Sequence, residues 1–240
     1  MKFLIFTFFT LLIRLTFALP ATSNNVTSLQ VESMRQIAAF TQNSQSLDIS
    51  PNATEDGLSG PCKPITMIFA KGTGENGNVG DGSSPGPAWI AEMRKTRGLD
   101  MIAVQGVPYN ADVEGYLIGG DPEGSERFLN ITNLAVEKCP NTRLVIGGYS
   151  QGAQLAHNAA MSFSPDVTSR VDAAVVFGDP KKSQPLGDIP PMKVLSICHD
   201  GDIICNYIGG SAPHLTYSQD AAKAASFAMT QLQQSSISRV

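Results

Sequence analysis

A serine lies between two glycines in the segment Gly148-Tyr149-Ser150-Gln151-Gly152, which fits the pattern G-x-S-x-G. In this pattern a strand turns sharply into a helix, and the turn holds the serine hydroxyl above the edge of a sheet. The outer glycines are required because the backbone passes too close to itself for larger side chains. Apolar residues 144–146 precede the segment and a helix-forming run follows it. The pattern therefore favours a nucleophilic Ser150 over a glycine-rich turn with a solvated serine.

A serine nucleophile needs a base, and the chain has three histidines. His157 lies about 10 Å from Ser150 along the expected helix axis, so we expect it on the helix surface. His199 ends an expected strand and sits too near the candidate acids in sequence, which favours a structural role. His214 lies in a loop before the last expected helix, from which its ring can reach over the sheet edge. We therefore predict His214 as the base.

The base in turn needs an orienting acid. The aspartates between the serine and this histidine are Asp166, Asp172, Asp179, Asp188, Asp200 and Asp202. Cys198 and Cys205 can close a small ring around Asp200 and Asp202, just beyond an expected strand. Both carboxylates qualify, Asp202 is favoured, and the alternative is that the two merely cap a turn. The order serine, acid, histidine is that of the α/β-hydrolases.

With these residues in place, the chain resembles the cutinases, a family of secreted serine esterases. The resemblance covers about three quarters of the chain, from Cys62 to the C-terminal helix. It rests on motifs that occur in the family's order: Phe69-Ala70-Lys71-Gly72-Thr73, Gln105-Gly106-Val107, Gly147-Gly148-Tyr149-Ser150-Gln151-Gly152-Ala153, the ring Cys198 to Cys205 enclosing Gly201-Asp202, and Ala212-Pro213-His214-Leu215. No single motif is decisive, but the set is specific.

The resemblance implies a role for each site residue. It makes Ser150 the nucleophile, Asp202 the acid and His214 the base, and it supports Asp202 over Asp200. It also implies an oxyanion hole formed by Thr73 and the backbone N–H of Gln151. Thr73 replaces the serine more usual in cutinases; its hydroxyl can make the same hydrogen bond, but its methyl group narrows the entrance.

Four cysteines, Cys62, Cys139, Cys198 and Cys205, permit three pairings in an oxidising compartment. Zinc is the rival interpretation, but the chain has no C-x-x-C pair and no suitably spaced histidines. The resemblance implies disulfides between Cys62 and Cys139 and between Cys198 and Cys205. We expect no metal and no organic cofactor.

The elements that must position these residues alternate along the chain. We expect strands at residues 65–70, 101–104, 144–147, 173–177 and 194–197, and helices at 87–97, 123–137, 151–163 and 219–232. Alternating strands and helices predict an α/β fold with a parallel sheet covered on both faces. The resemblance implies a minimal α/β-hydrolase with a central five-stranded, mainly parallel sheet. Each predicted site residue then lies near the carboxyl edge of that sheet.

The chain divides into three parts. Residues 1–18 have a basic start, an apolar core too short to span a bilayer and a small-x-small cleavage site, which predicts a signal peptide and secretion. Residues 19–60 are rich in polar residues and predict a flexible extension with one short helix near 29–40. Residues 61–240 form the expected domain. Glycosylation sequons occur at Asn25, Asn52 and Asn130.

The short helix of the extension has two interpretations. It is either detached or packed on the surface, which we favour, or it lies over the active-site mouth as a partial lid formed by Val31, Met34, Ile37, Ala38 and Phe40.

The formal net charge is −4 and the pI is about 5.3, which gives no attraction for nucleic acid. We expect a secreted monomer without a membrane span, whose partner is its ester substrate. The expected activity is hydrolysis of cutin-type polyester and of short-to-medium acyl esters through an acyl-enzyme. The alternatives are an acetylxylan-type polysaccharide deacetylase of the same fold and a secreted, non-catalytic wall or binding protein.

Overall fold

The computed structural model describes residues 27–45, 54–80, 82 and 84–238. Five strands form one sheet in the order β2-β1-β3-β4-β5, and every neighbouring pair is parallel. The strands are β1 (Ile65–Ala70), β2 (Ile102–Gly106), β3 (Arg143–Tyr149), β4 (Val171–Phe177) and β5 (Val194–Ile197). The predicted α/β fold with a five-stranded sheet is confirmed.

Strands β1 and β5 have the predicted bounds, whereas β2 and β3 continue into glycines that the sequence placed beyond their ends. Gly106 pairs with Phe69 and Gly148 pairs with Ala70 across the ladder from β1. Glycine weakens an isolated strand. Here, backbone pairing with the central strand overrides that weakness and carries β3 directly to the serine turn.

The helices are α1 (Ser28–Gln45), α2 (Pro85–Arg97), α3 (Val113–Leu117), α4 (Pro122–Lys138), α5 (Gln151–Ala160), α6 (Pro165–Arg170), α7 (Ile203–Asn206) and α8 (Ala221–Ser238). Helix α4 begins where Asp121 accepts a hydrogen bond from the Gly124 N–H and Pro122 occupies the first helical position. Helix α5 ends three residues before the predicted end. A 3₁₀ turn, Tyr217–Asp220, precedes α8.

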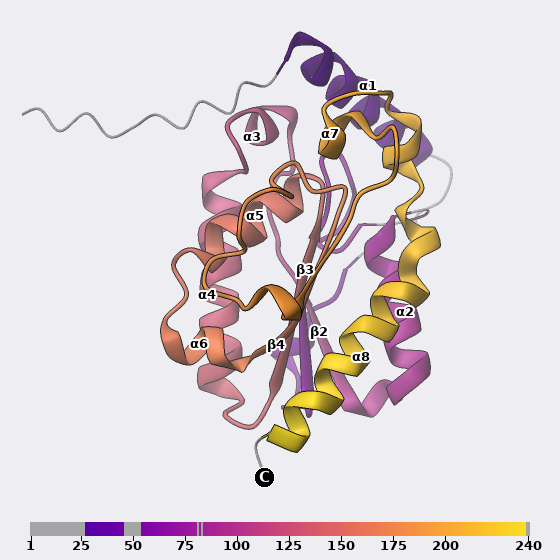
Figure 1. Ribbon diagram of the computed structural model, residues 1–240. Helices are drawn as coiled ribbons and strands as arrows, with labels where there is room; N and C mark the ends of the chain where they lie inside the picture. The colour runs from indigo at the N-terminus through magenta and orange to yellow at the C-terminus, as the bar shows by residue number, and fades with distance from the viewer. Residues whose placement is uncertain (1–26, 46–53, 81, 83, 239–240) are drawn as a thin grey trace, which may run out of the picture.

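The helices form a layer on each face of the sheet (Figure 1). Helices α4, α5 and α6 cover one face, and α2 and α8 cover the other. Successive strand side chains point to opposite faces. Thus Ile68 joins the core under α4 and α5, while Phe69 joins the core under α2 and α8. In the second core, the Phe69, Trp89 and Phe177 rings pack edge to face with centroids 5.8–6.5 Å apart.

The segment just before residue 61, where we expected the domain to begin, packs against the domain. Glu55 receives two hydrogen bonds from the Arg94 guanidinium, at 2.5 and 2.7 Å, and its carbonyl oxygen accepts one from the Gly106 N–H. Leu58 is buried in the core. The Cys62–Cys139 disulfide then ties the segment before β1 to the end of α4, as the resemblance implied.

The expectation that His157 lies on the helix surface is wrong. Its ring is buried, with Nε2 2.9 Å from Asp179 Oδ2 and Nδ1 3.2 Å from the Pro185 carbonyl oxygen. The loop after β4 passes over this side of α5 and supplies both partners. The pair therefore fixes that loop to the helix that carries the serine at its start.

Candidate active site

Ser150 occupies a sharp turn between β3 and α5, where its backbone has φ 56° and ψ −117°. The flanking glycines are sterically necessary, as the pattern predicts. A Cβ on Gly148 would lie 2.2 Å from the Gly152 carbonyl oxygen, and a Cβ on Gly152 would lie 2.1 Å from the Ala70 carbonyl oxygen. Glycine at both positions therefore allows the close backbone approach at this turn, in which Ser150 has a conformation that few non-glycine residues adopt.

The structure brings His214 and Asp202 together. The His214 Nδ1 lies 2.8 Å from Asp202 Oδ2, and both side chains are fully buried. Asp202 caps the N-terminus of α7, where its Oδ1 accepts a hydrogen bond from the Ile204 N–H at 2.8 Å. Asp200, by contrast, is exposed. The geometry therefore pairs the histidine with Asp202, the acid that the sequence favoured.

The carboxylate of Asp202 is held in its charged form. Burial alone would raise its pKa, but the hydrogen bond and charge of His214 lower it, helped by hydrogen bonds from the Tyr217 hydroxyl and the Ile204 N–H. The net effect is a pKa below the usual value for aspartate. Tyr217 donates to Asp202 Oδ2 at 2.6 Å, and burial together with this carboxylate raises the tyrosine pKa. The Asp202 carboxylate is thus ionised and held in a fixed orientation.

Tyr149 places the serine turn beside the histidine. Its hydroxyl donates to the His214 carbonyl oxygen at 2.6 Å, and its ring stacks on the imidazole with centroids 5.0 Å apart. Ser150 follows directly in the chain. Within the described residues, Ser150 Oγ and His214 Nε2 are buried and have no hydrogen-bond partner. The serine–histidine bond is therefore not formed in this structure, and such bonds often tighten only when substrate binds.

Thr73 and Gln151 meet on the other side of the serine. The Gln151 Nε2 donates to Thr73 Oγ1 at 2.8 Å and to the Asp112 carbonyl oxygen at 2.6 Å. Because Thr73 Oγ1 accepts this bond, its own proton is free to point elsewhere. Gln151 is also the first residue of α5, where backbone N–H groups lack helical partners. This region can therefore offer a hydroxyl and a main-chain N–H to an anion.

The sequence did not indicate two residues that support His214, namely Gly178 and Tyr217. Gly178 has φ 54°, and a Cβ there would lie 2.6 Å from His214 Cε1, so no larger side chain fits under the ring. Gly178 directly follows β4, and nothing in its local sequence pointed to His214. Tyr217 lies three positions after His214 along the chain, and nothing in its local sequence pointed to Asp202.

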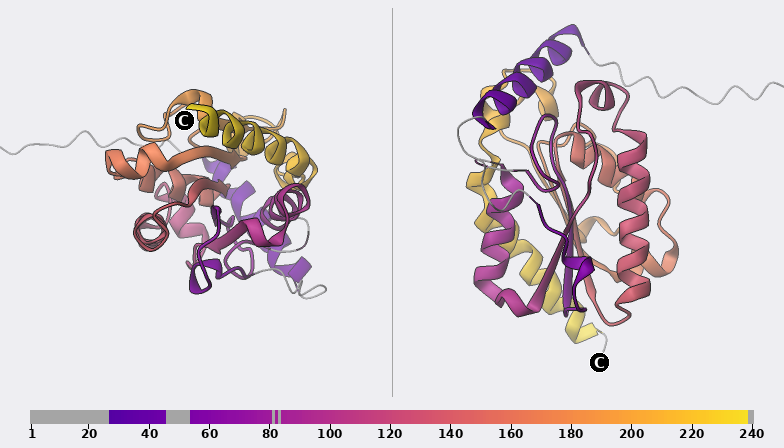
Figure 2. Two further views of the ribbon diagram at one scale, coloured as in Figure 1. Left: turned by 90° about the horizontal axis from the view of Figure 1, so that it is seen from below. Right: turned by 180° about the vertical axis from the view of Figure 1, so that it is seen from behind.

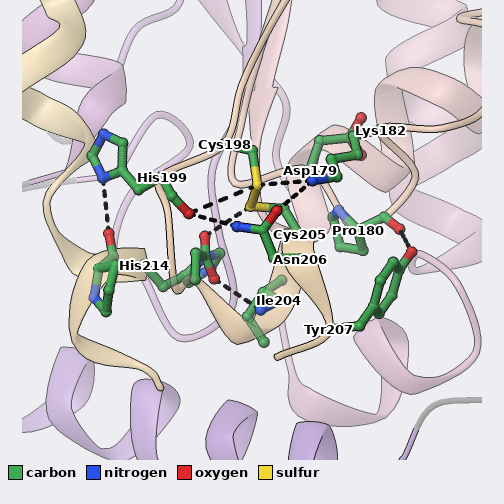
Figure 3. Close-up of a disulfide and its surroundings, with 12 residues drawn as sticks. Asp179, Pro180, Lys182, Cys198, His199, Ile204, Cys205, Asn206, Tyr207 and His214 are labelled. Atoms are coloured by element: carbon green, nitrogen blue, oxygen red, sulfur yellow. Dashed lines mark hydrogen bonds and ion pairs between the residues drawn. A yellow bond between two sulfur atoms is a disulfide. The ribbon is translucent and has the colours of Figure 1, made fainter. Parts of the chain in front are cut away.

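The Cys198–Cys205 disulfide closes the predicted ring around Asp202 (Figure 3). The Asn206 side chain donates to the His199 carbonyl oxygen at 2.7 Å, across the ring. The loop at 208–212 also pairs with the ring. Gly210 donates its N–H to the Gly201 carbonyl oxygen at 2.9 Å and accepts from the Ile203 N–H at 3.2 Å. The disulfide and the main-chain hydrogen bonds of Gly210 thus hold the ring that contains Asp202.

Helix α1 crosses the carboxyl edge of the sheet between α3 and α7, as Figure 1 and the view from behind in Figure 2 show. Met34 and Ile37 are buried against Tyr116 of α3 and Ile203 of α7. A Cβ added to Gly74, the residue after Thr73, would lie 3.2 Å from the backbone of α1 at position 38. Helix α1 packs at the rim of the site, so it is not detached; this fits both the surface-packed helix that we favoured and the partial lid. The side chain of Phe40 lies outside the described residues.

The remaining predicted features have different outcomes. Asn130 is exposed on α4, whereas Asn25, Asn52 and the predicted signal peptide lie outside the described residues. The described part of the chain contains no group of histidine, cysteine, aspartate or glutamate side chains that could hold a metal ion. Among the helices described, none is long and apolar enough to cross a bilayer.

The sheet, the serine turn and the buried aspartate–histidine pair define an α/β-hydrolase. The sequence model of the cutinase family matches residues 61–232. A cutinase of Blumeria hordei is 61% identical over 217 residues, which cover 90% of this chain and 92% of that protein. The chain belongs to the cutinase family, and it is a carboxylic ester hydrolase.

Solved structures show the same likeness. The Trichoderma reesei cutinase in complex with a C11Y4 phosphonate inhibitor is 36% identical, with a TM-score of 0.70. The match covers 83% of this chain and 89% of that one. The catalytic core domain of acetyl xylan esterase from Trichoderma reesei is 22% identical, with a TM-score of 0.57 and coverage of 71% and 100%. The latter likeness shows the fold alone.

Proposed function

We propose that this protein hydrolyses its ester substrate through an acyl-enzyme formed on Ser150. The observation that carries the proposal is the buried hydrogen bond between Asp202 and His214, directly beside a serine held in a strained turn. Such an arrangement of nucleophile, base and orienting acid recurs in serine hydrolases of unrelated folds.

In the first step His214 Nε2 takes the Ser150 proton while Oγ attacks the ester carbonyl carbon. Asp202 keeps the imidazole proton on Nδ1 and stabilises the positive ring. The carbonyl oxygen becomes an anion, which the Gln151 backbone N–H and Thr73 stabilise; one such donor contributes about 3 kcal/mol to lowering the barrier. The tetrahedral intermediate collapses, and His214 gives its proton to the departing alcohol.

The second step releases the carboxylic acid product from Ser150. A water molecule loses its proton to His214 and attacks the acyl carbon, and collapse of the new intermediate returns the proton to Ser150. The same donors stabilise the second oxyanion. No metal or organic cofactor takes part in this sequence.

We propose cutin-type polyester as the natural substrate, because the relative at 61% identity is a cutinase. The rival substrate is an acetylated polysaccharide, since an acetyl xylan esterase shares the fold. A hydrolysis profile over p-nitrophenyl acetate, butyrate and palmitate, with cutin, polycaprolactone and acetylated xylan, separates the two. Hydrolysis of acetylated xylan without hydrolysis of either polyester would contradict the cutinase assignment.

We also propose secretion as a monomer after removal of residues 1–18. The two disulfides support an oxidising destination. Glycosylation at Asn25, Asn52 and Asn130 belongs to the same proposal. The mass of the mature protein before and after enzymatic deglycosylation tests it.

Short acyl groups should be the best small substrates, with kcat/KM highest between acetate and hexanoate. Each acyl methylene buried against an apolar wall contributes about 0.8 kcal/mol. In the loop ahead of His214, Gly210 is hydrogen-bonded to the ring that contains Asp202, and a Cβ on Gly209 would lie 2.0 Å from the Gly201 carbonyl oxygen; branched apolar side chains are usual in this loop in cutinases. The p-nitrophenyl series measures this preference, and palmitate hydrolysed as well as butyrate would contradict it.

Substrate should reach the serine only after α1 moves, because Ser150 is 1% exposed and His214 is 0% exposed. Met34→Asp places a charge in the apolar contact that holds α1, so it should raise the initial rate on p-nitrophenyl butyrate several-fold. Leu29→Asp is the matched control, because Leu29 lies on the same helix and is 69% exposed. Equal rates for the two variants and the wild type would show that α1 does not limit access.

A further inference from the structure

A second histidine–aspartate pair lies beside the first. His199 belongs to the small disulfide ring, and Figure 3 shows it directly after Cys198. Its Nε2 lies 2.6 Å from Asp220 Oδ2. Its Nδ1 lies 3.1 Å from the Pro213 carbonyl oxygen and 3.0 Å from Thr216 Oγ1. Both ring nitrogens therefore face oxygen atoms.

Both ring nitrogens of His199 have hydrogen-bond partners. The Asp220 carboxylate and the Pro213 carbonyl oxygen can only accept hydrogen bonds. The Thr216 hydroxyl lies 2.8 Å from the Pro213 carbonyl oxygen and can donate its proton either to that oxygen or to His199 Nδ1. The His199 ring therefore bridges Asp220 on one side and Pro213 and Thr216 on the other by hydrogen bonds.

The ring of His199 is linked to the catalytic base through the chain. Pro213 immediately precedes His214 in the 3₁₀ turn Ala212–Leu215. Asp220 ends the next 3₁₀ turn, where α8 begins. His199 thus joins the loop that carries the base to a helix packed against the sheet.

The main chain of His199 is linked to the acid. Its N–H donates to the Tyr217 hydroxyl at 2.9 Å, and that hydroxyl donates to Asp202 Oδ2 at 2.6 Å. Its carbonyl oxygen accepts from the Asp202 N–H at 3.1 Å. The His199 and Tyr217 rings also stack, with centroids 4.1 Å apart and an angle of 24°. One residue therefore contacts both the support of the acid and the support of the base.

We infer that His199 is a positioning residue for the esterase reaction. Through its hydrogen bonds to Asp220, Pro213 and Thr216, it fixes the loop bearing His214 against the ring bearing Asp202. This inference rests on the proposed function, because His199 acts through these two residues and does not touch substrate. A displacement of about 1 Å in a catalytic group can cost about 10²-fold in rate, so a link at this place affects turnover.

His199→Phe tests the role of the ring nitrogens. Phenylalanine keeps an aromatic ring to stack on Tyr217 but donates no hydrogen bond. We expect kcat on p-nitrophenyl butyrate to fall about 10- to 100-fold, with little change in KM, because the substrate surface is untouched. Asp200→Asn, a change at the exposed neighbour, is the control and should keep the wild-type kcat.

Asp220→Ala tests the hydrogen bond to Asp220 without removing the histidine. Alone it should lower kcat in the same manner, and in the His199→Phe background it should cause no further loss, because both changes break one link. The Asp220→Ala variant decides the question if His199→Phe does not fold.

Two results would overturn the inference: wild-type kcat in His199→Phe or in Asp220→Ala, or additive losses in the double variant. Failure of the proposed function gives a different result. In that case the wild-type protein itself forms no adduct on Ser150 with an organophosphonate, whatever residue stands at position 199.

Discussion

Ser150→Ala should abolish ester turnover and leave the fold intact. The change removes the attacking oxygen, and the flanking glycines still permit the turn in which the residue sits. Ser150 Oγ has no hydrogen-bond partner among the described residues, so its loss leaves no buried group unsatisfied. Removing a triad nucleophile in a serine hydrolase costs about 10⁶-fold in kcat. The measurement is the initial rate on p-nitrophenyl butyrate, with circular dichroism and the melting temperature as the check on folding.

A folded Ser150→Ala variant with near wild-type turnover would exclude Ser150 as the nucleophile. Ser162→Ala provides the matched control, because Ser162 is exposed just beyond the end of α5. That variant should retain the wild-type rate.

Asp202→Asn should lower kcat by several orders of magnitude, about 10⁴-fold where the same change has been made in a comparable triad. The amide donates a hydrogen bond where the carboxylate accepted one, so His214 is held in the wrong tautomer. Asp200→Asn is the matched control two residues away and should cost far less, because that side chain is exposed. Both rates are measured on p-nitrophenyl butyrate with folding checked in parallel.

The opposite result, a large loss in Asp200→Asn and a small loss in Asp202→Asn, would make Asp200 the acid. Asp202→Asn is less disruptive to folding than a substitution that changes the size of the side chain. The asparagine retains a side-chain oxygen that can accept the hydrogen bond from the Ile204 N–H.

The sequence predicted the fold and the serine turn because their determinants are local. An apolar run followed by G-x-S-x-G specifies strand, turn and helix within ten residues, and the structure has this arrangement around Ser150. The small ring Cys198–Cys205 likewise constrains Asp202 through two residues close to it in sequence.

What the sequence did not predict depends on contacts between distant segments. His157 has the spacing of a helix-surface residue, and only the loop after β4 makes its position buried. The place of α1 likewise depends on apolar surfaces of α3 and α7 that lie far along the chain. Periodicity gives the face of a helix, but it does not identify the surface on which that face packs.

The most direct test of the proposed mechanism is covalent labelling by a p-nitrophenyl alkylphosphonate, which reacts with a serine that a neighbouring base has activated. Intact mass spectrometry of the wild-type protein should show one phosphonyl adduct per chain, with loss of esterase activity in proportion. Peptide mapping should place the adduct on Ser150, and Ser150→Ala should remain unlabelled. An active wild-type protein that forms no adduct, or forms it on another residue, would contradict the proposed acyl-enzyme on Ser150.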